Sequence, residues 1–498
     1  MKSKKSFFGI LVLVLVFGMM VVGCDEGNNP DTPPTPQPGE SANNPIEHIA
    51  ETNLGLMTSS ASGWRQLLNS IESTGKYINL DLSACTMTGT IFNPDATVET
   101  GKKYIVSIIL PTVATEIGAG TFSSPTFRNF TNLKSINGEN IITIGDYSFL
   151  RETSGDYSWS YLQSVDFPKT TTIGEYAFSY TRLETVTFPQ VTTIGDSAFY
   201  SCYSLKNASF PVVQNIGVGA FSSCSYLESI SFPASAELGL TSDSYSNPFT
   251  RCSKITFTLN GTGSLSTIEN GKALVRNGTI LLAYPSASGV ISMDNITALD
   301  GKVFYGCGAI TGINFPQVTS IGSEAFRNCS NYTGISTQDV SFPKAIIIGS
   351  YAFADCLSLQ SASFPLVTTI GSFAFAYSSN LMILNIPSVT KIEQAAFVST
   401  GINELSITMG STRPTLGHRL FDFITTSKTV RIKVPLGATG YTPFTGSSVT
   451  VSSDNATVNW ANGFRGGGWN GATFDTGSQY LQGVNYINQN ITLIIQQQ

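Results

Sequence analysis

Apolar and polar positions alternate in short runs along most of the chain. In Val186-Thr-Phe188 the two apolar side chains point to one face of a strand and Thr187 points to the other, because successive side chains alternate across a strand. Pro189 follows directly and ends the strand, since proline has no N–H to donate to a sheet ladder. The pattern predicts a short strand with one buried face, bounded by a turn.

The same run continues into a second apolar segment. Val191, Ile194 and the pair Ala198-Phe199 are expected to point inward, and Gly195 is expected to form the bend between them. Strand, turn and apolar segment together make one unit of 20 to 30 residues.

This unit recurs over most of the molecule. Its Ile-Gly-x-x-Ala-Phe core places the repeat phenylalanine at Phe122, Phe149, Phe178, Phe199, Phe221, Phe249, Phe304, Phe326, Phe353, Phe375 and Phe397, with a weaker copy ending at Phe421. The steps are 21 to 29 residues, except for one of 55. Such a period is typical of a solenoid, in which each unit buries its apolar face against the next. We therefore predict a mainly β repeat solenoid over residues 113–435, with short irregular or helical turns, wound as a right-handed superhelix and capped at both ends.

The flanking segments are read as caps and an insertion. Residues 51–112 are expected to cover the first turn with a helix, since Trp64, Leu67, Leu68 and Ile71 fall on one helical face, followed by strands near 77–85 and 105–110. The 55-residue step contains Asn277-Gly278, which favours a type I′ hairpin turn within residues 265–290. Residues 436–498 lose the repeat and are expected to form a C-terminal β cap or a small module.

The N-terminus has the pattern of an export signal. Lys2, Lys4 and Lys5 precede an uncharged apolar run from Phe7 to Val22, which is too short for a comfortable membrane span. Residues 1–23 are read as a lipoprotein signal peptide and Cys24 as the lipidation site, with ordinary secretory cleavage as the alternative. The proline-rich residues 24–50 are read as a tether.

The composition argues against several classes of function. Only 12% of residues are charged and the net charge is −6, so no basic surface for nucleic acid is expected. The two histidines, His48 and His418, belong to no catalytic or zinc motif. The carboxylates of Asp146, Glu175, Asp196 and Glu324 are expected to be solvated. The tail contributes Asp454 and Asp475, too few to suggest a glycan-processing site, and Gly466-Gly-Gly468 precedes no helix signal. No catalytic residue, metal site or cofactor is predicted, and the chain is not expected to be an enzyme.

Cysteine follows the repeat phenylalanine at a fixed distance of three residues. The six such positions are Cys202, Cys224, Cys252, Cys307, Cys329 and Cys356, and other copies have Thr181, Ser378 or Thr400 there. A placement tied to the repeat indicates packing, so buried free thiols are expected. Disulfides between neighbouring turns remain an alternative, because strands about 4.8 Å apart do not exclude them.

The outward strand positions form the candidate binding surface. They are small, mostly hydroxylated and nearly uncharged: Ser164, Asp166, Thr185, Thr187, Asn207, Ser209, Ser229, Ser231, Asn314, Ser361 and Ser363. This ladder, expected on the concave face, offers hydrogen bonds to an extended protein or glycan but lacks the Trp, Tyr and Arg anchors of tight interfaces. Keeping the solenoid soluble would explain the same residues.

The unit Leu-x-x-Val-x-Phe-Pro-x-Val-Thr-x-Ile-Gly-x-x-Ala-Phe-x-x-Cys resembles the BspA-like leucine-rich repeats of bacterial surface proteins, especially the spirochaete lipoprotein type. The resemblance covers residues 105 to 435. It implies a curved solenoid displayed on the cell surface that takes part in adhesion or coaggregation. Together with the N-terminal pattern and the missing catalytic motifs, it leads us to expect a lipid-anchored, monomeric, non-enzymatic protein on the bacterial outer membrane or cell surface. Its implied partners are host matrix proteins such as fibronectin, other bacterial surface proteins, or glycans. A periplasmic scaffolding lipoprotein is the alternative.

Overall fold

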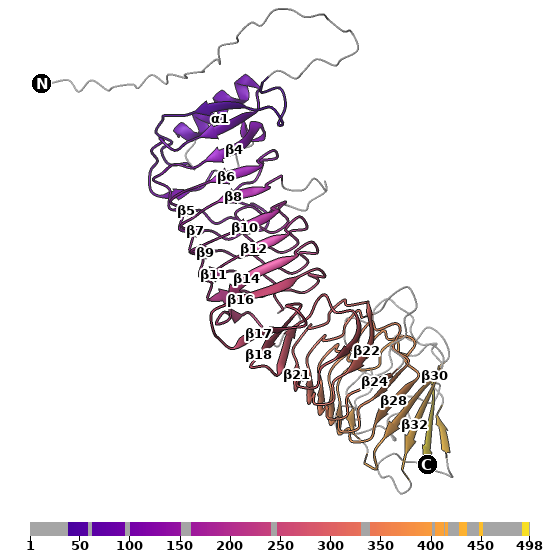
Figure 1. The fold of residues 1–498 in the computed structure, drawn as a ribbon. Helices are drawn as coiled ribbons and strands as arrows, with labels where there is room; N and C mark the ends of the chain where they lie inside the picture. The colour runs from indigo at the N-terminus through magenta and orange to yellow at the C-terminus, as the bar shows by residue number, and fades with distance from the viewer. Residues whose placement is uncertain are drawn as a thin grey trace, which may run out of the picture. The chain divides into compact units, whose positions relative to one another are not determined.

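A computed structural model describes residues 38–57, 62–94, 100–150, 161–240, 247–329, 339–400, 404–412, 414–416, 428–435, 448–451 and 491–497. The chain divides into two compact units, residues 1–227 with 231–233, and residues 228–230 with 234–498. Each unit is a stack of solenoid turns built from short β-strands and is described separately below (Figure 1).

In the first unit, long strands and short strands form separate sheets (Figure 1). The long strands pair in the orders β1-β2-β4-β6-β8 and β10-β12, and the short ones in the order β13-β11-β9-β7-β5-β3. The elements are β1 (Ile46–Ile49), α1 (Gly63–Thr74), β2 (Ile78–Asp81), β3 (Ile91–Phe92), the 3-10 helix η1 (Lys102–Tyr104), β4 (Ile105–Ile109), β5 (Glu116–Ile117), β6 (Ser135–Asn137), β7 (Thr143–Ile144), β8 (Ser164–Asp166), β9 (Thr172–Ile173), β10 (Thr185–Thr187), β11 (Thr193–Ile194), β12 (Asn207–Ser209) and β13 (Asn215–Ile216).

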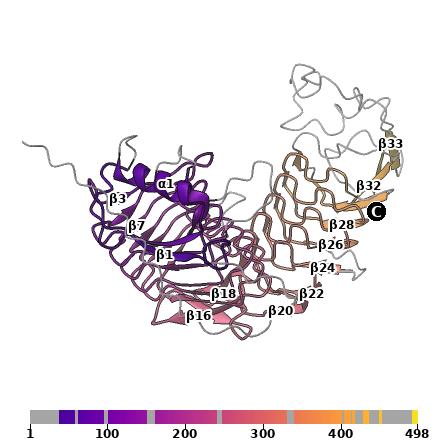
Figure 2. The same cartoon turned by 90° about the horizontal axis from the view of Figure 1, so that it is seen from above.

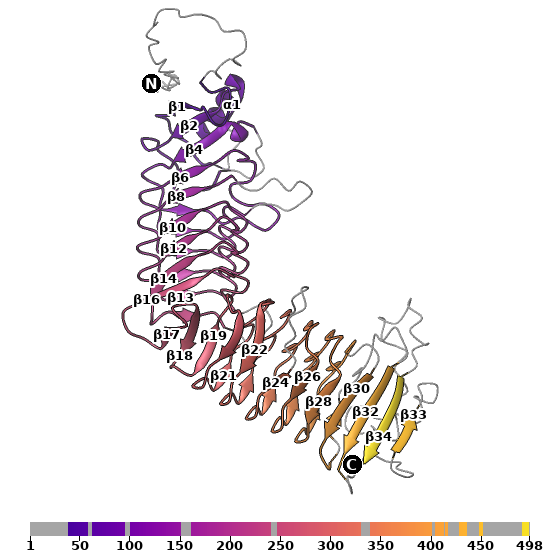
Figure 3. The ribbon, with the colours of Figure 1, turned by 45° about the vertical axis from the view of Figure 1, so that its right-hand side comes forward.

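Strand β14 (Ser229–Pro233) has residues in both units, and the later elements belong to the second unit. They are β15 (Glu237–Leu238), β16 (Thr256–Asn260), β17 (Leu265–Ile268), β18 (Ala273–Arg276), β19 (Ile280–Ala283), β20 (Gly289–Ser292), β21 (Ala298–Leu299), β22 (Ile310–Asn314), β23 (Ser320–Ile321), β24 (Asp339–Ser341), β25 (Ile347–Ile348), β26 (Ser361–Ser363), β27 (Thr369–Ile370), β28 (Ile383–Ile386), β29 (Lys391–Ile392), β30 (Glu404–Met409), β31 (Thr415–Leu416), β32 (Lys428–Val434), β33 (Ser448–Val451) and β34 (Ile491–Gln497). Most pair in parallel with the strand one turn away, in two sheets of nine strands (Figure 3).

Helix α1 lies at the N-terminal end of the first stack (Figure 2). It begins where the Ser62 hydroxyl accepts a hydrogen bond from the N–H of Arg65, and it ends at Gly75 in the left-handed conformation. Its predicted face is buried, and the ring of Trp64 meets the edge of Phe92 with centroids 5.8 Å apart. The helix thus covers the apolar end of the stack, as a solenoid requires.

The repeat phenylalanines form a continuous column of stacked rings through the first unit. Phe149, Phe178, Phe199 and Phe221 have successive centroid separations of 5.2, 5.2 and 5.1 Å and interplanar angles of 4°, 15° and 3°. Rings this close and nearly parallel bury large apolar areas and gain additional aromatic contact energy. The column is the core that the spacing predicts.

One member of that column was assigned to the wrong residue. Phe122 is 58% exposed, in a turn closed by Thr121 and Ser124, whereas Phe127 is buried and stacks on Phe149 at 4.5 Å. The sequence Gly120-Thr-Phe122 imitates the repeat core, but the turn at Gly120–Ser124 displaces the register by five residues.

Gly195 has a different role from the bend expected of it. A Cβ at this position would lie 2.6 Å from the carbonyl carbon of Gly174 and 2.7 Å from the N of Glu175 in the preceding turn. Glycine is required because the backbones of successive turns approach closely. The positive φ that redirects the chain belongs instead to Ser197, at 52°.

The 55-residue step contains the expected hairpin. Strands β18 and β19 pair antiparallel around Asn277 and Gly278, whose φ angles of 51° and 72° suit a type I′ turn. Strand β19 then pairs in parallel with β21, so the hairpin enters the sheet of short strands instead of standing outside it.

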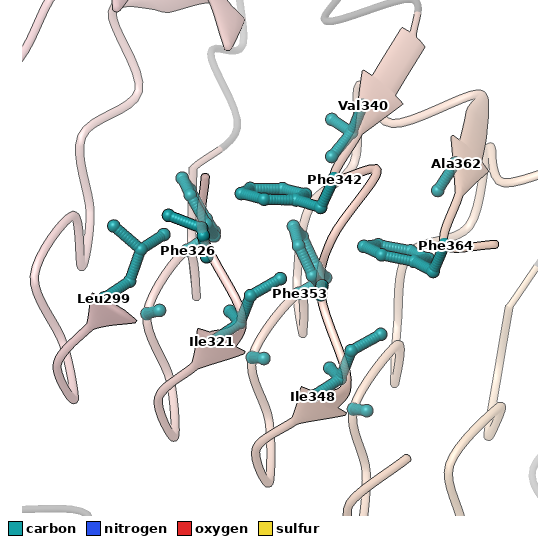
Figure 4. Packing of buried hydrophobic residues seen from close by; sticks show 14 of the residues in the cluster. Leu299, Ile321, Phe326, Val340, Phe342, Ile348, Phe353, Ala362 and Phe364 are labelled. Atoms are coloured by element: carbon teal, nitrogen blue, oxygen red, sulfur yellow. The ribbon is translucent and has the colours of Figure 1, made fainter. Parts of the chain in front are cut away.

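The second unit repeats the packing of the first. Figure 4 shows Phe326 and Phe353, and beside them Phe342 and Phe364, as two columns of rings above the aliphatic residues of the short strands. The ring centroids are 5.1 Å apart in the first column and 5.9 Å in the second. Two interlocked columns explain why both the strand phenylalanine and the Ala-Phe phenylalanine recur.

At the C-terminal end, β34 pairs in parallel with β32, and β33 pairs antiparallel with β34. Several sequence-based expectations lie outside the described residues: the signal peptide, Cys24 and the first part of the tether, His418, the repeat copy at Phe421, and the tail residues Asp454, Asp475 and Gly466–Gly468.

The reassigned column gives a direct test. Phe127→Ala should lower the free energy of unfolding of the first unit by about 3–5 kcal/mol, because it opens a cavity between Phe92 and Phe149. Phe122→Ala, on an exposed ring, should change it by less than about 0.5 kcal/mol. Urea denaturation followed by tryptophan fluorescence measures both variants, and equal losses would contradict the assignment.

Candidate functional site

The outward strand residues lie in register, as expected. In the first unit Thr185 stands beside Asn207 and Thr187 beside Ser209, while Ser164 and Asp166 continue the columns that contain Ser107 and Ile109. In the second unit Asn314 stands beside Ser341, and Ser341 beside Ser363, with Ser361 next to Asp339. Parallel pairing without register shifts over these turns places the predicted ladder on the outer faces of the strands. Five members are half-buried there, Ser209, Ser229, Ser231, Ser361 and Ser363, and the others are exposed.

Several side chains of this ladder already form hydrogen bonds with side chains of neighbouring turns. The hydroxyl of Ser231 donates to Ser209 Oγ at 3.0 Å, and the amide of Asn314 donates to Ser292 Oγ at 2.9 Å. The amide of Asn385 similarly donates to Ser363 Oγ at 3.2 Å. Side chains that satisfy one another in this way have less hydrogen-bonding capacity for a ligand.

The segment from β8 to β10 differs from the rest. Ser164, Asp166, Thr185 and Thr187 are all exposed, and their side chains make no hydrogen bond to another described residue. These four residues, here called the open ladder, are the members of the predicted surface that retain their full capacity for a partner.

The repeat cysteines serve the core. All six are free thiols, and all but the partly exposed Cys329 are buried. The thiol of Cys202 donates to the carbonyl of Phe178 at 3.1 Å, that of Cys224 to Phe199 at 3.0 Å, and that of Cys356 to Phe326 at 3.0 Å. Each thiol thus satisfies a buried carbonyl of the preceding turn. Ser378, in the same position, bonds Phe353 in the same way at 2.6 Å.

The predicted solvated carboxylates behave in two ways. Asp146 and Asp196 are exposed, and each accepts a hydrogen bond at 2.7 Å from a backbone N–H of the next turn, of Glu175 and Val218 respectively. Glu324 contradicts the expectation: it is only 2% exposed, lies between Lys302 and Arg327, and has a positive φ of 56°. The equivalent positions in other turns, such as Tyr147, Ser197 and Ala395, are half-buried or buried, so its place two residues before the repeat phenylalanine was a signal of burial that sequence reasoning missed.

Tyrosines gather at the turn around the repeat phenylalanine, away from the ladder. Tyr147 and Tyr176, each two residues before the phenylalanine, stack at 5.4 Å in the first unit, and Tyr351 stacks on Phe373 at 4.8 Å in the second. All four have positive φ, which costs free energy for a residue with a side chain. The aromatic residues missing from the ladder therefore line a separate edge, and their constant distance from the phenylalanine is a signal that sequence reasoning missed.

The described residues contain no group of three His, Cys, Asp or Glu side chains placed to hold a metal. An apolar void of about 10 Å³ lies in the second unit against Phe326, Phe353, Cys329 and Cys356, which is room for about one water molecule. Within the same residues no helix has the length and apolar character to span a membrane. His48 lies on β1, half-buried, and burial lowers its pKa.

Comparison with known proteins identifies the repeat. A family model described as "BspA type Leucine rich repeat region", in six copies, matches residues 83–156, 153–272, 297–428 and 346–452. No curated protein matches the chain.

Three solved structures are similar to parts of the chain. A leucine rich cell surface protein from Faecalibacterium prausnitzii is 28% identical, with 66% of this chain and 83% of that one covered and a TM-score of 0.49. A leucine-rich repeat protein from Bacteroides ovatus is 24% identical, covering 68% and 82%, with a TM-score of 0.44. The pneumococcal vaccine antigen PcpA is 19% identical, covering 71% and 76%, with a TM-score of 0.41.

The thiols provide a test of the packing. Burial raises the pKa of Cys307 and of Cys356 to about 12, so both stay protonated in the folded protein at about pH 8 and should not react with a disulfide reagent until the chain unfolds. Because thiols in unfolded chains have a pKa of about 8.5, this contribution to stability is complete below that pH and is lost as the pH rises toward 12. Peptide mapping after labelling in buffer and in urea measures the reaction. Rapid labelling of either cysteine in buffer would contradict the burial.

Proposed function

The chain belongs to the BspA type leucine-rich repeat family, and on this basis we propose that it is a lipid-anchored, non-enzymatic surface protein that binds a protein ligand through its open ladder. The family suggests a repeat protein for protein–protein interaction. The observation that carries the proposal is the open ladder itself, Ser164, Asp166, Thr185 and Thr187, exposed on neighbouring turns with unoccupied side chains.

The ladder suits an extended ligand. Its side chains occupy the outward positions of the corresponding strands β8 and β10 in two successive turns, so a ligand segment lying across the strands meets similar groups in each turn. Hydroxyl groups can donate and accept, which permits bonds to the backbone of a protein segment. The absence of large anchors from these four positions favours a binding energy spread over several turns, as expected for adhesion to host matrix protein or coaggregation with other bacteria.

The N-terminal sequence supports export and anchoring. The basic start, the apolar run and Gly23-Cys24 make Cys24 the proposed lipidation site, in the manner of the spirochaete lipoprotein type. The proline-rich segment that follows would hold the repeats away from the membrane. The competing function, a periplasmic scaffold, uses the same anchor on the inner side of the envelope.

Location is tested by protease treatment of intact cells that produce the wild type or Cys24→Ala. The wild type should be degraded on intact cells and fractionate with membranes, whereas Cys24→Ala should leave the membrane fraction. Protection of the wild type on intact cells, with degradation after lysis, would instead support the periplasmic scaffold.

Binding is tested with immobilised fibronectin and the full chain carrying Thr187→Arg. A bulky cation in the open ladder should weaken binding by at least about ten-fold, because it blocks two adjacent columns. Gln190→Arg, an exposed position in the following turn, adds the same charge outside the ladder and should leave binding unchanged. Unaltered binding by Thr187→Arg, or no binding by the wild type, would refute the ladder as a site for this ligand.

A further inference from the structure

Five charged side chains gather at one edge of the second unit, around the turns that carry the repeat phenylalanines. They are Arg251, Lys302, Glu324, Arg327 and Asp355, and with Tyr305, Asn328 and Tyr351 they form what we call the basic-tyrosine cluster. The whole chain has only 27 basic and 33 acidic residues, and most other turns place an uncharged residue at the equivalent positions, such as Ser197, Gly219 or Phe373. A charge-poor protein thus concentrates charge at this edge.

Burial of the Glu324 carboxylate costs free energy, because a buried charge loses its contact with water. Its side chain is nearly inaccessible, Oε2 accepts from Arg327 Nη1 at 3.2 Å, and Oε1 lies 3.9 Å from Lys302 Nζ with no hydrogen bond from a described residue. Buried ion pairs seldom add to stability, and a positive φ at both Lys302 and Glu324 adds strain. What the buried carboxylate does achieve is to hold the Lys302 and Arg327 cations side by side.

Positive charge exceeds negative charge in the cluster. Arg327 also bonds Asp355 at 3.2 Å, but Arg251 is exposed and has no carboxylate partner among the described residues. Burial lowers the pKa of Lys302; Glu324 opposes this change, and the charges of Arg327 and Arg251 add to the lowering. The three cations repel one another, and only two carboxylates lie among them. The cluster therefore has a net positive charge that a bound anion would neutralise.

The neutral groups hold the cations in an organised array. Tyr305 is the centre, because its hydroxyl accepts hydrogen bonds from Arg251 and Asn328 at 3.3 Å each, while Arg251 and Lys302 lie 5.1 and 5.5 Å from its ring centroid. The Arg327 guanidinium lies 5.0 Å from the ring centroid of Tyr351. Stacking on a ring fixes the orientation of a guanidinium group, whose planar fork of N–H donors can then bind a carboxylate or sulfate.

The mixture of charged and neutral polar groups suits a sugar as the source of that anion. Phenol, amide and carboxylate groups beside the cations can bond the hydroxyl groups that flank a carboxylate or sulfate on a pyranose ring. We propose that the basic-tyrosine cluster binds an acidic polysaccharide through the carboxylate or sulfate groups of its sugars. This site is separate from the open ladder and does not depend on it.

The test measures binding of the detergent-solubilised full chain to immobilised polygalacturonate, dextran sulfate, neutral dextran and poly-glutamate. We expect binding to one or both acidic polysaccharides, weakened by salt, and little to dextran or poly-glutamate. Stronger binding to polygalacturonate would identify a carboxylate as the anion, and stronger binding to dextran sulfate a sulfate. Binding to neither polysaccharide, or equal binding to poly-glutamate, would overturn the proposal.

Variants locate the site. Arg251→Gln should weaken binding to the acidic polysaccharide by at least about five-fold while keeping the thermal midpoint, since Arg251 is exposed and unpaired with a carboxylate. Tyr305→Phe retains every charge but removes the hydroxyl that orients Arg251 and Asn328, and a weaker loss is expected. Lys344→Gln removes an exposed cation from a different turn of the repeat and should have no effect. Wild-type affinity in both Arg251→Gln and Tyr305→Phe would overturn the assignment, whatever the polysaccharide.

Discussion

Stacking of identical side chains from successive turns is the interaction on which the rest of the structure depends. No single turn can cover its own phenylalanine, so each ring is buried by the rings above and below it, as in the series Phe149, Phe178 and Phe199. That requirement fixes the register of everything else. Glycines must allow the backbones to approach, thiols must satisfy the carbonyls beside the rings, and outward residues must fall into columns.

The core could be predicted from sequence because stacking repeats it a dozen times, and a pattern with many copies outweighs local ambiguity. The errors occurred where a local feature broke the repeat. At Phe122 a turn imitated the core motif while Phe127 occupied the column. For Gly195 the relevant neighbour is one turn away, at Gly174, and a linear reading does not contain it. Glu324 was predicted to be solvated because burial of its carboxylate depends on Lys302 and Arg327, which the repeat pattern does not connect.

Some surface residues of the solenoid bond to neighbouring turns, and others remain available to bind a partner. The strand ladder follows from register and was found from sequence, but its internal hydrogen bonds, such as Ser231 to Ser209, limit the part that can meet a partner. In the turn around the repeat phenylalanine the sequence led us to expect only solvated carboxylates, yet this turn holds Tyr147, Tyr176 and the charged residues near Tyr305, most of them at strained backbone positions. Strained backbone positions recur at this edge from turn to turn, but the side chains that they carry differ. Such an edge allows the protein to change its ligand without altering its core.

The phenylalanine column couples the stability of each turn to that of the turns next to it. Hydrogen exchange of Phe199→Ala, measured peptide by peptide against the wild type, tests it most directly. If the column carries the stability, protection should fall in the turn of Phe199 and in its neighbours at Phe178 and Phe221, and remain near wild type around Phe127. Protection lost equally throughout the first unit, or lost in the turn of Phe199 alone, would contradict the account.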